Sequence, residues 1–293
     1  MPSLKAIKRR IASVSNTQQI MKAMNMVAAS KVQKNKSKME AIKPLLNEAR
    51  KFIDKGVSVE GLAEGAFESI YYTSRPVKNV GYVVISGERG LCGSYNANIL
   101  KTALSHMENN ENAKKNDLVI TVGAKSKEFF VRNKKHIIED YAGVLESEPY
   151  KTAEKIANRL VDMFIADKNQ IDEVYIAYTQ FDTLLSHTPA VVKILPFNPT
   201  PPDTNVTDWR EVIYEPDVHT YLKKAVPIYL TMFIYGAMVE SSVCEQASRM
   251  ISMDAAARNA GEIVDDLTLQ YNRQRQGVIT QEISEIVGGA NVI

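Results

Sequence analysis

The segment LKAIKRRIASVSNTQQIMKAMNMVAASKVQ, Leu4–Gln33, opens a stretch with one proline, Pro44, and no glycine before Gly56. Alternating steps of three and four residues from Leu4 to Ile53 visit fifteen positions, of which twelve are apolar. The three exceptions are the amides Gln18, Asn25 and Asn35. Amides in such a stripe can fix the register of paired helices. The narrow, continuous stripe therefore predicts a long coiled-coil helix rather than a broad-faced globular one.

The C-terminal segment repeats this pattern. From Leu222 the same steps visit nineteen positions, fourteen of them apolar, and the pattern fades after Val278. Pro216 and Asp217 suit the first turn of a helix, whereas Pro227 predicts a kink or an early break. Because a long helix with a narrow apolar stripe gains most of its stability from packing, we expect the two stripes to pack antiparallel on each other. The longer C-terminal helix should project past its partner. Two separate homodimeric coils are the alternative.

The middle of the chain is typical of an α/β domain. Short apolar, β-branched runs at 79–86, 117–123, 136–140 and 173–179 predict buried strands, and helical stretches at about 96–111, 124–134 and 150–168 lie between them. A further strand precedes the proline-rich loop within 188–204, and another is expected near 208–214. This alternation favours a mostly parallel sheet. The predicted domains are an N-terminal helix at 1–56, an α/β domain at 57–216 and a C-terminal helix at 217–293.

The glycine loop GERGLCGS, residues 87–94, stands between a predicted strand and a predicted helix, where phosphate loops occur. Its spacing is Gly87-x-x-Gly90-x-x-Gly93, which is not the dinucleotide pattern Gly-x-Gly-x-x-Gly. Ser94 and Tyr95 stand where a Walker loop needs Lys and then Ser or Thr. We therefore expect these glycines to permit tight turning and close packing, and we expect no bound nucleotide.

No other part of the sequence indicates catalysis. The four histidines are scattered without a metal-binding spacing, and the two cysteines, Cys92 and Cys244, form neither a disulfide framework nor a zinc pattern. We expect both cysteines to be buried, and we predict no catalytic residue, cofactor or metal. Residues 1–55 carry thirteen Lys and Arg against three Asp and Glu, a local charge of +10. This charge favours an acidic partner, although a solvated helix face would produce it too.

Three blocks of sequence resemble the gamma subunit of the F-type ATP synthase. They are NTQQIMKAMNMVAASK at 16–31, ERGLCGSYN at 88–96, and EQASRMISMDAAARNAGEIVDDLTLQYNRQRQGVITQEISEIVGGA at 245–290. The resemblance covers essentially the whole chain. Within the family, the chain is similar to the bacterial form. Glu88 stands where the family usually has Asp, and Ser94 stands where it usually has Gly. The resemblance implies an antiparallel coiled coil of the terminal helices with an inserted Rossmann-like α/β domain.

The resemblance also implies a rotor shaft rather than an enzyme. Its expected partners are the alpha and beta subunits of the catalytic ring, the epsilon subunit and the membrane c-ring, with no nucleic acid and no direct small-molecule substrate. By match to the family's motifs, the residues expected to contact the ring are Lys22, Met24, Arg249, Arg275, Gln276 and Thr280. Tyr214 is the candidate contact to the c-ring or epsilon. Seam packing of Met24 and a solvated position for the arginines remain as alternatives.

Two other functions stay open from the sequence. One is an α/β enzyme with a helical dimerisation arm, and the other is a nucleic-acid binder that uses the basic N-terminal helix. The absence of tyrosine and tryptophan from that helix argues against base stacking. Because we find neither a secretory signal nor a transit segment, we expect a peripheral location on the cytoplasmic face of the cell membrane.

Overall fold

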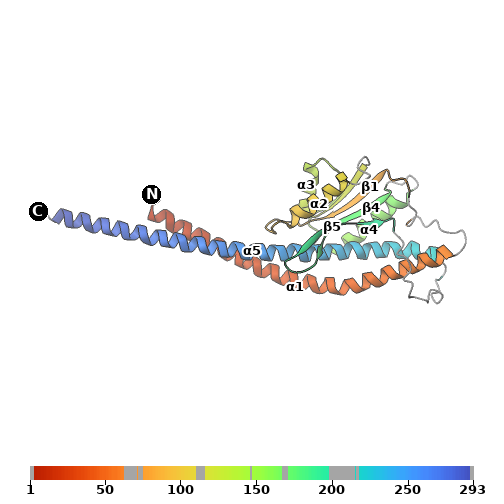
Figure 1. The fold of residues 1–293 in the computed structure, drawn as a ribbon, viewed down its shortest axis with the longest axis horizontal. Helices are drawn as coiled ribbons and strands as arrows, with labels where there is room; N and C mark the ends of the chain where they lie inside the picture. Colours follow the sequence, from red (N-terminus) through yellow and green to blue (C-terminus); the bar gives the residue numbers. More distant parts are fainter. Residues whose placement is uncertain are drawn as a thin grey trace. The chain divides into compact units, whose positions relative to one another are not determined.

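The computed structural model describes residues 3–62, 71, 75–109, 116–145, 147–166, 171–197, 215 and 218–290. The chain forms two compact units. The terminal unit consists of residues 1–30 and 249–293, and the central unit consists of residues 31–248. Two long helices, α1 (Leu4–Leu62) and α5 (Val218–Ala290), contribute residues to both units. Figure 1 shows them in red to orange and in blue.

In the terminal unit, α1 and α5 pack antiparallel. The side-chain amide of Gln18 donates to the Ala257 carbonyl at 3.1 Å, and that of Asn25 donates to the Met250 carbonyl at 2.9 Å. The partner of residue 18 on α1 is residue 257 on α5, and the partner of residue 25 is residue 250. The two helices therefore run in opposite directions. Both amides belong to the predicted stripe, where they fix the register of the two helices.

The last part of α5 extends past the start of α1. The apolar stripe of α5 is buried or half-buried as far as Gln274, and every described side chain from Arg275 to Val287 is exposed. The large apolar side chains among these are Val278, Ile279, Ile283, Ile286 and Val287, with exposed fractions from 37% to 71%. The end of α5 is therefore a single helix among the described residues, as the sequence predicts.

The central unit contains a five-stranded sheet in the order β3-β2-β1-β4-β5. Its strands are β1 (Asn79–Ile85), β2 (Asn116–Val122), β3 (His136–Tyr141), β4 (Glu173–Phe181) and β5 (His187–Leu195). The first four strands are parallel, and β5 is antiparallel to β4. The helices are α2 (Tyr95–Asn109), α3 (Ala124–Arg132) and α4 (Pro149–Ile165). The predicted α/β alternation is confirmed.

Helices cover both faces of this sheet. Side chains of α2 and α3, including Ile99 and Phe130, pack with Tyr82 of β1 in one apolar core. The other core joins the opposite face of the sheet to α4 and α5. Because most of the strand residues are enclosed on both sides, the central strands are nearly continuous apolar runs, as buried parallel strands usually are.

Helix α5 is buried on two faces within the central unit. One face is the predicted stripe toward α1, where Gly236 lies so close that an added Cβ would be 2.9 Å from a Leu46 methyl. The other face carries Val226, Leu230, Ile234 and Met238 at four-residue spacing, with exposed fractions of 0% to 1%. This second stripe packs in the core beneath the sheet. The heptad pattern of the first stripe did not predict this second stripe.

The main predictions from periodicity are confirmed. All fifteen stripe positions of the first helix are buried or half-buried. The early break allowed at Pro227 is wrong, because α5 runs through this residue. The predicted strand near 208–214, together with Pro216 and Asp217, lies outside the described residues. The three predicted domain ranges stay a prediction.

Helix α5 is also long and apolar enough to cross a membrane, by length and composition alone. Of the most apolar window, 56% is buried inside the protein. The two-sided packing of α5 on α1 and on the sheet accounts for this apolar composition.

A substitution of Gly123, which lies between β2 and α3, tests how closely this backbone packs against Ser86. It has a φ of +94°, and a Cβ added there would lie 2.3 Å from the Ser86 carbonyl oxygen. We expect Gly123→Ala to lower the free energy of unfolding by about 3 kcal/mol, because positive φ and overlap with backbone both oppose a side chain. Urea denaturation followed by circular dichroism measures the change.

The matched control is Gly90→Ala. Gly90 is exposed, and an added Cβ there would have nothing within 4 Å. This variant should stay within about 0.5 kcal/mol of the parent chain. Equal stabilities for the two variants would contradict the packing described for Gly123.

Candidate functional site

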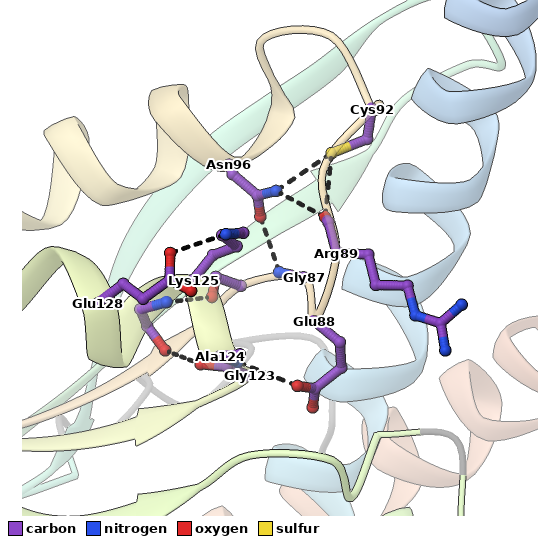
Figure 2. Close-up of polar contacts among 11 residues, drawn as sticks. Gly87, Glu88, Arg89, Cys92, Asn96, Gly123, Ala124, Lys125 and Glu128 are labelled. Carbon is purple, nitrogen blue, oxygen red and sulfur yellow. Dashed lines mark hydrogen bonds and ion pairs between the residues drawn. The ribbon is translucent and has the colours of Figure 1, made fainter.

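The glycine loop is held by hydrogen bonds within the central unit. Asn96, in the first turn of α2, accepts the Gly87 N–H at 2.8 Å through Oδ1. Its Nδ2 donates to the Arg89 carbonyl at 3.2 Å and lies 3.1 Å from Cys92 Sγ (Figure 2). The Gly87 carbonyl in turn accepts the Lys125 N–H at 3.2 Å. The Gly87 amide, which a phosphate loop would point at its ligand, is thus already bonded.

Glu88 holds the start of α3. Its carboxylate accepts the Ala124 N–H at 3.0 Å and the Gly143 N–H at 2.8 Å. Figure 2 shows this side chain extending from the loop toward the first turn of α3. Because a negative charge is favourable at a helix N-terminus, Glu88 serves as a cap supplied from another element. The first N–H of α3 is therefore not available to an external anion.

Helix α5 occupies the crevice where a doubly wound sheet would bind a nucleotide. The strand order reverses between β1 and β4, and ligands of such sheets bind beyond the carboxyl ends of the strands at this switch point. Here the Glu245 carboxylate lies so close to Gly87 that an added Cβ would be 2.8 Å from Oε1. Ser248 Oγ donates to the Cys92 carbonyl at 3.0 Å. A negative carboxylate at this position disfavours a bound phosphate.

The same stretch of α5 completes the hydrogen bonding of β4. The pairing of β1 with β4 ends at Val84 and Ala177, so the next backbone N–H groups on that edge of β4 lose their strand partner. Ser241 Oγ accepts the Thr179 N–H at 3.1 Å, and a Glu240 oxygen accepts the Phe181 N–H at 2.9 Å. Side chains of α5 therefore replace the missing strand and satisfy backbone groups that would otherwise be costly to bury.

A small apolar cluster lies beside these bonds. Cys92, Tyr95 and Cys244 are all buried, as expected for the cysteines, and Cys244 Sγ lies 3.6 Å from the Thr179 carbonyl. Burial raises the pKa of the Cys244 thiol, and the Glu240 and Asp182 carboxylates add to the effect. Burial also raises the pKa of the Tyr95 phenol. Both groups stay protonated at neutral pH, which suits a structural contact.

The residues that join the sheet to α5 are Glu240, Ser241, Cys244 and Ser248. The sequence analysis did not single them out, because each is a common residue without a catalytic spacing. One signal existed: Glu240 and Ser241 are polar residues between the stripe positions Val239 and Val243, and Cys244 and Ser248 follow Val243 outside the stripe. Among the described residues, no group of three His, Cys, Asp or Glu side chains could hold a metal ion.

Six of the seven predicted contact residues belong to the terminal unit. On α1, Lys22 is exposed and Met24 is half-buried. On α5, Arg249 is 8% exposed, whereas Arg275, Gln276 and Thr280 are exposed. Tyr214 lies outside the described residues.

The predicted contact residues on α5 form two groups. Gln276 and Thr280 are one helical turn apart, and the Thr280 hydroxyl donates to the Gln276 carbonyl at 2.9 Å. Arg249 lies 26 positions before Arg275, or about 39 Å along a helix. Arg249 is thus at the level of the paired helices, and the later group stands where the single-helix end begins.

The bond from β4 to Ser241 gives a testable contribution to stability. Ser241 is 1% exposed, so Ser241→Ala leaves the Thr179 N–H buried without this acceptor. We expect a loss of about 1–3 kcal/mol in the free energy of unfolding. Thermal and urea denaturation measure it.

Ser284→Ala is the control for this prediction. The Ser284 hydroxyl is exposed and donates to the Thr280 carbonyl of its own helix. This variant should unfold like the parent chain. If Ser241→Ala did the same, the contact between α5 and β4 would not support the fold.

The buried cysteines should resist thiol reagents. Because the thiolate is the reactive form and burial raises the pKa of Cys244, the thiol stays protonated well above neutral pH. We expect reaction with dithionitrobenzoate at pH 8 to be about 100-fold slower in the native chain than in urea. Rapid release of two equivalents of thionitrobenzoate per native chain would contradict the buried positions of Cys92 and Cys244.

Comparison with known proteins gives one consistent result. A family model described as ATP synthase matches residues 3–293. The chain is 37% identical over 290 residues to the ATP synthase gamma chain of Desulforamulus reducens, covering 99% of each chain. It is 35% identical to the sodium ion specific ATP synthase gamma chain of Acetobacterium woodii, covering 98% of this chain and 97% of that one.

Solved structures have the same fold at lower identity. A chain from the rotor of the Euglena gracilis mitochondrial ATP synthase aligns with a TM-score of 0.67 and 16% identity, covering 94% of this chain and 98% of that chain. A chain from the central stalk and c-ring of the Tetrahymena thermophila mitochondrial ATP synthase aligns with a TM-score of 0.57 and 23% identity, covering 81% and 99%.

Proposed function

The chain belongs to the ATP synthase gamma chain family, and on this premise we propose that its two long helices form the shaft that couples ion-driven rotation to catalysis. A gamma chain is a non-catalytic component of the central stalk, or rotor. In the proposed mechanism, rotation of a membrane c-ring turns the shaft. The shaft then moves the catalytic sites on surrounding beta subunits through their conformational states.

One observation of the structure carries this proposal: α5 continues as an exposed single helix past the start of α1. A shaft that drives neighbouring sites through different states must present different faces in different directions. A symmetric pair of equal helices would present similar faces, whereas a single helical end gives one asymmetric surface. Its exposed apolar residues, Ile279, Ile283 and Ile286 among them, are suited to contact protein rather than water.

We infer that the predicted contact residues face the alpha and beta subunits. Arg275 and Gln276 are exposed on the single-helix end, where a guanidinium can make forked bonds to carboxylates. Lys22 is exposed on the basic helix α1 and would meet acidic loops of the ring. Met24 is half-buried, so part of its polarizable side chain is accessible to a partner. Thr280, which is exposed, and Arg249, of which only 8% is exposed, complete the proposed contact set.

Besides the helices that would contact the ring, the proposed shaft carries the α/β domain, which is attached to α5. The bonds from Glu240 and Ser241 fix β4 on α5, and the bond from Ser248 fixes the glycine loop on it, so that torque received by the domain would pass to the helix. We propose that this end meets the c-ring and the epsilon subunit, with Tyr214 as a contact. The chain would then lie on the cytoplasmic face of the membrane as a peripheral subunit.

The substitution Gln276→Ala tests the shaft surface. We expect it to reduce ion pumping per ATP hydrolysed by about twofold or more, because a polar contact worth about 1 kcal/mol with the ring is lost. The chain should still fold, since Gln276 is exposed. ATP-driven acidification or sodium uptake by vesicles that contain the reconstituted complex, divided by ATP turnover, measures the coupling.

Thr268→Ala is the matched control. Thr268 is also exposed on α5, and its hydroxyl donates to the Val264 carbonyl of the same helix. It should leave the pumping ratio unchanged. The proposed contact at Gln276 would be refuted by equal pumping ratios for the parent complex and both variants.

A further inference from the structure

A glycine in the middle of α5 makes room for a side chain of α1. The chain has no other glycine between Gly236 and Gly277 than Gly261. A Cβ added at Gly261 would lie 2.8 Å from Nε2 of Gln18. Both residues belong to the terminal unit. The missing side chain therefore leaves a gap on the surface of α5 that the Gln18 amide fills, and we call this gap the Gly261 notch.

The Gln18 amide is also hydrogen-bonded beside the notch. Its Nε2 donates to the Ala257 carbonyl at 3.1 Å. In an α-helix this carbonyl points toward the N–H of the residue four positions later, which here is Gly261. The acceptor and the notch thus lie next to each other, and the half-buried Gln18 side chain fits both at once. The hydrogen bond fixes the direction of the amide, and the notch fixes its position along α5.

Both partners of this contact are unfavourable for stability when taken alone. A glycine in a helix interior lowers the helix-forming equilibrium by about fivefold relative to alanine. An amide in an apolar stripe weakens the pairing of two helices while it fixes their register. Stability alone would favour alanine at position 261 and an apolar residue at position 18. The pair of residues therefore serves the relative position of the helices.

Other registers of α1 and α5 would lose the notch. If α5 moved by one helical turn in either direction, Ala257 or Asp265 would stand opposite Gln18 in place of Gly261. Each of these has a Cβ where the amide now lies. Asn25 specifies the same register, because its amide donates to the Met250 carbonyl at 2.9 Å, seven residues from Gln18 on α1 and seven from Ala257 on α5.

Gln18 is the last amide of the α1 stripe before α5 continues alone. The remaining stripe positions toward the start of α1 are apolar: Val14, Ile11, Ile7 and Leu4. Apolar contacts are non-directional, so they stabilise this stretch without fixing its register. Arg275 follows Gly261 by 14 positions, or about 21 Å along a helix. The position of the single-helix end relative to α1 is therefore set most directly at the Gly261 notch.

We propose that Gln18 is a positioning residue for rotary coupling. Its amide, held in the Gly261 notch, keeps the single-helix end of α5 in one register on α1. The exposed residues Arg275, Gln276 and Thr280 are then presented to the ring in one direction. Gln18 acts through α5 and need not touch the ring itself. This inference rests on the shaft function proposed above, because only a partner of the single-helix end would detect its direction.

A double-mutant cycle in the full chain tests the contact without other subunits. Gly261→Ala favours the helix but displaces the Gln18 amide from its acceptor, so the two effects should roughly cancel and leave the melting temperature near that of the parent chain. In the Gln18→Ala background no amide is displaced, and Gly261→Ala should raise the melting temperature by about 2–4 °C. Thermal unfolding followed by circular dichroism measures both steps.

Gly277→Ala is the matched control for the cycle. Gly277 is exposed on the same helix, and an added Cβ there would have nothing within 4 Å. This substitution should raise the melting temperature by about 2–4 °C in the parent and in the Gln18→Ala background alike. An equally large gain from Gly261→Ala in both backgrounds would overturn the contact between Gln18 and the notch.

Spin labels measure the position of α1 on α5 directly. Lys8→Cys and Asp254→Cys provide one exposed site on each helix, and the native cysteines are buried. Pulsed electron paramagnetic resonance should give a narrow distance distribution for the otherwise unchanged chain. We expect a distribution about twofold wider after Gln18→Ala or Gly261→Ala, because the amide no longer fixes the register. Unchanged widths in both variants would overturn the positioning role.

The double variant Gln18→Ala/Gly261→Ala separates position from stability in the reconstituted complex. This chain should be at least as stable as the parent chain, yet its amide contact is gone. We expect ion pumping per ATP hydrolysed to fall by about twofold or more, whereas a contact that served stability alone would leave the ratio unchanged. Thr268→Ala, on an exposed position of α5, again provides the control.

Gln276→Ala distinguishes failure of this inference from failure of the shaft function. If Gln276→Ala lowers the pumping ratio and the double variant does not, the positioning role of Gln18 is overturned and the shaft surface stands. If neither changes the ratio, the shaft surface is overturned, and the role of Gln18 in coupling fails with it. A lower ratio in both, with the double variant as stable as the parent chain, is the result that we expect.

Discussion

The two-sided burial of α5 in the central unit is the constraint on which the fold depends. One stripe faces α1, and the other, Val226, Leu230, Ile234 and Met238, lies in the core beneath the sheet. Each fully buried apolar side chain contributes about 1.5–3 kcal/mol. These contributions also keep the helix continuous through Pro227, whose ring costs about 3 kcal/mol in a helix interior. Without α5, the face of the sheet that α5 covers together with α4 would lose part of its cover.

The same helix explains why a doubly wound sheet with a glycine-containing loop need not bind nucleotide. In enzymes of this topology, the crevice beyond β1 and β4 stays open for a ligand. Here α5 lies across that crevice, and its side chains take up the Thr179, Phe181 and Cys92 backbone groups. A residue with a side chain would not fit at position 87, because Glu245 and Asn96 approach the Gly87 backbone closely. The glycine therefore serves helix packing, as its spacing indicated.

Local periodicity made most of the fold predictable. The heptad stripe of α1 and the apolar strand runs are properties of neighbouring residues, so the fifteen stripe positions and four strands could be read directly. The contacts of the candidate site could not be predicted in this way. Ser248 and Cys92 are 156 residues apart, and nothing in either residue's surroundings indicates the other. Likewise, Thr179 is an ordinary strand residue until the structure shows its hydroxyl buried and unpaired among the described residues.

Polar groups fix the position of α5 both where it packs on α1 and where it packs on the sheet. Apolar stripes alone would tolerate a shift of one helical turn, because successive turns present similar side chains. Hydrogen bonds are directional and do not tolerate it. Gln18 and Asn25 set the register of the terminal unit, and Ser241 and Glu240 set that of the sheet. The proposed transmission of torque requires that α5 does not slide along either partner. The apolar surfaces therefore supply the stability of each attachment, whereas a few amides, hydroxyls and one carboxylate supply its resistance to sliding.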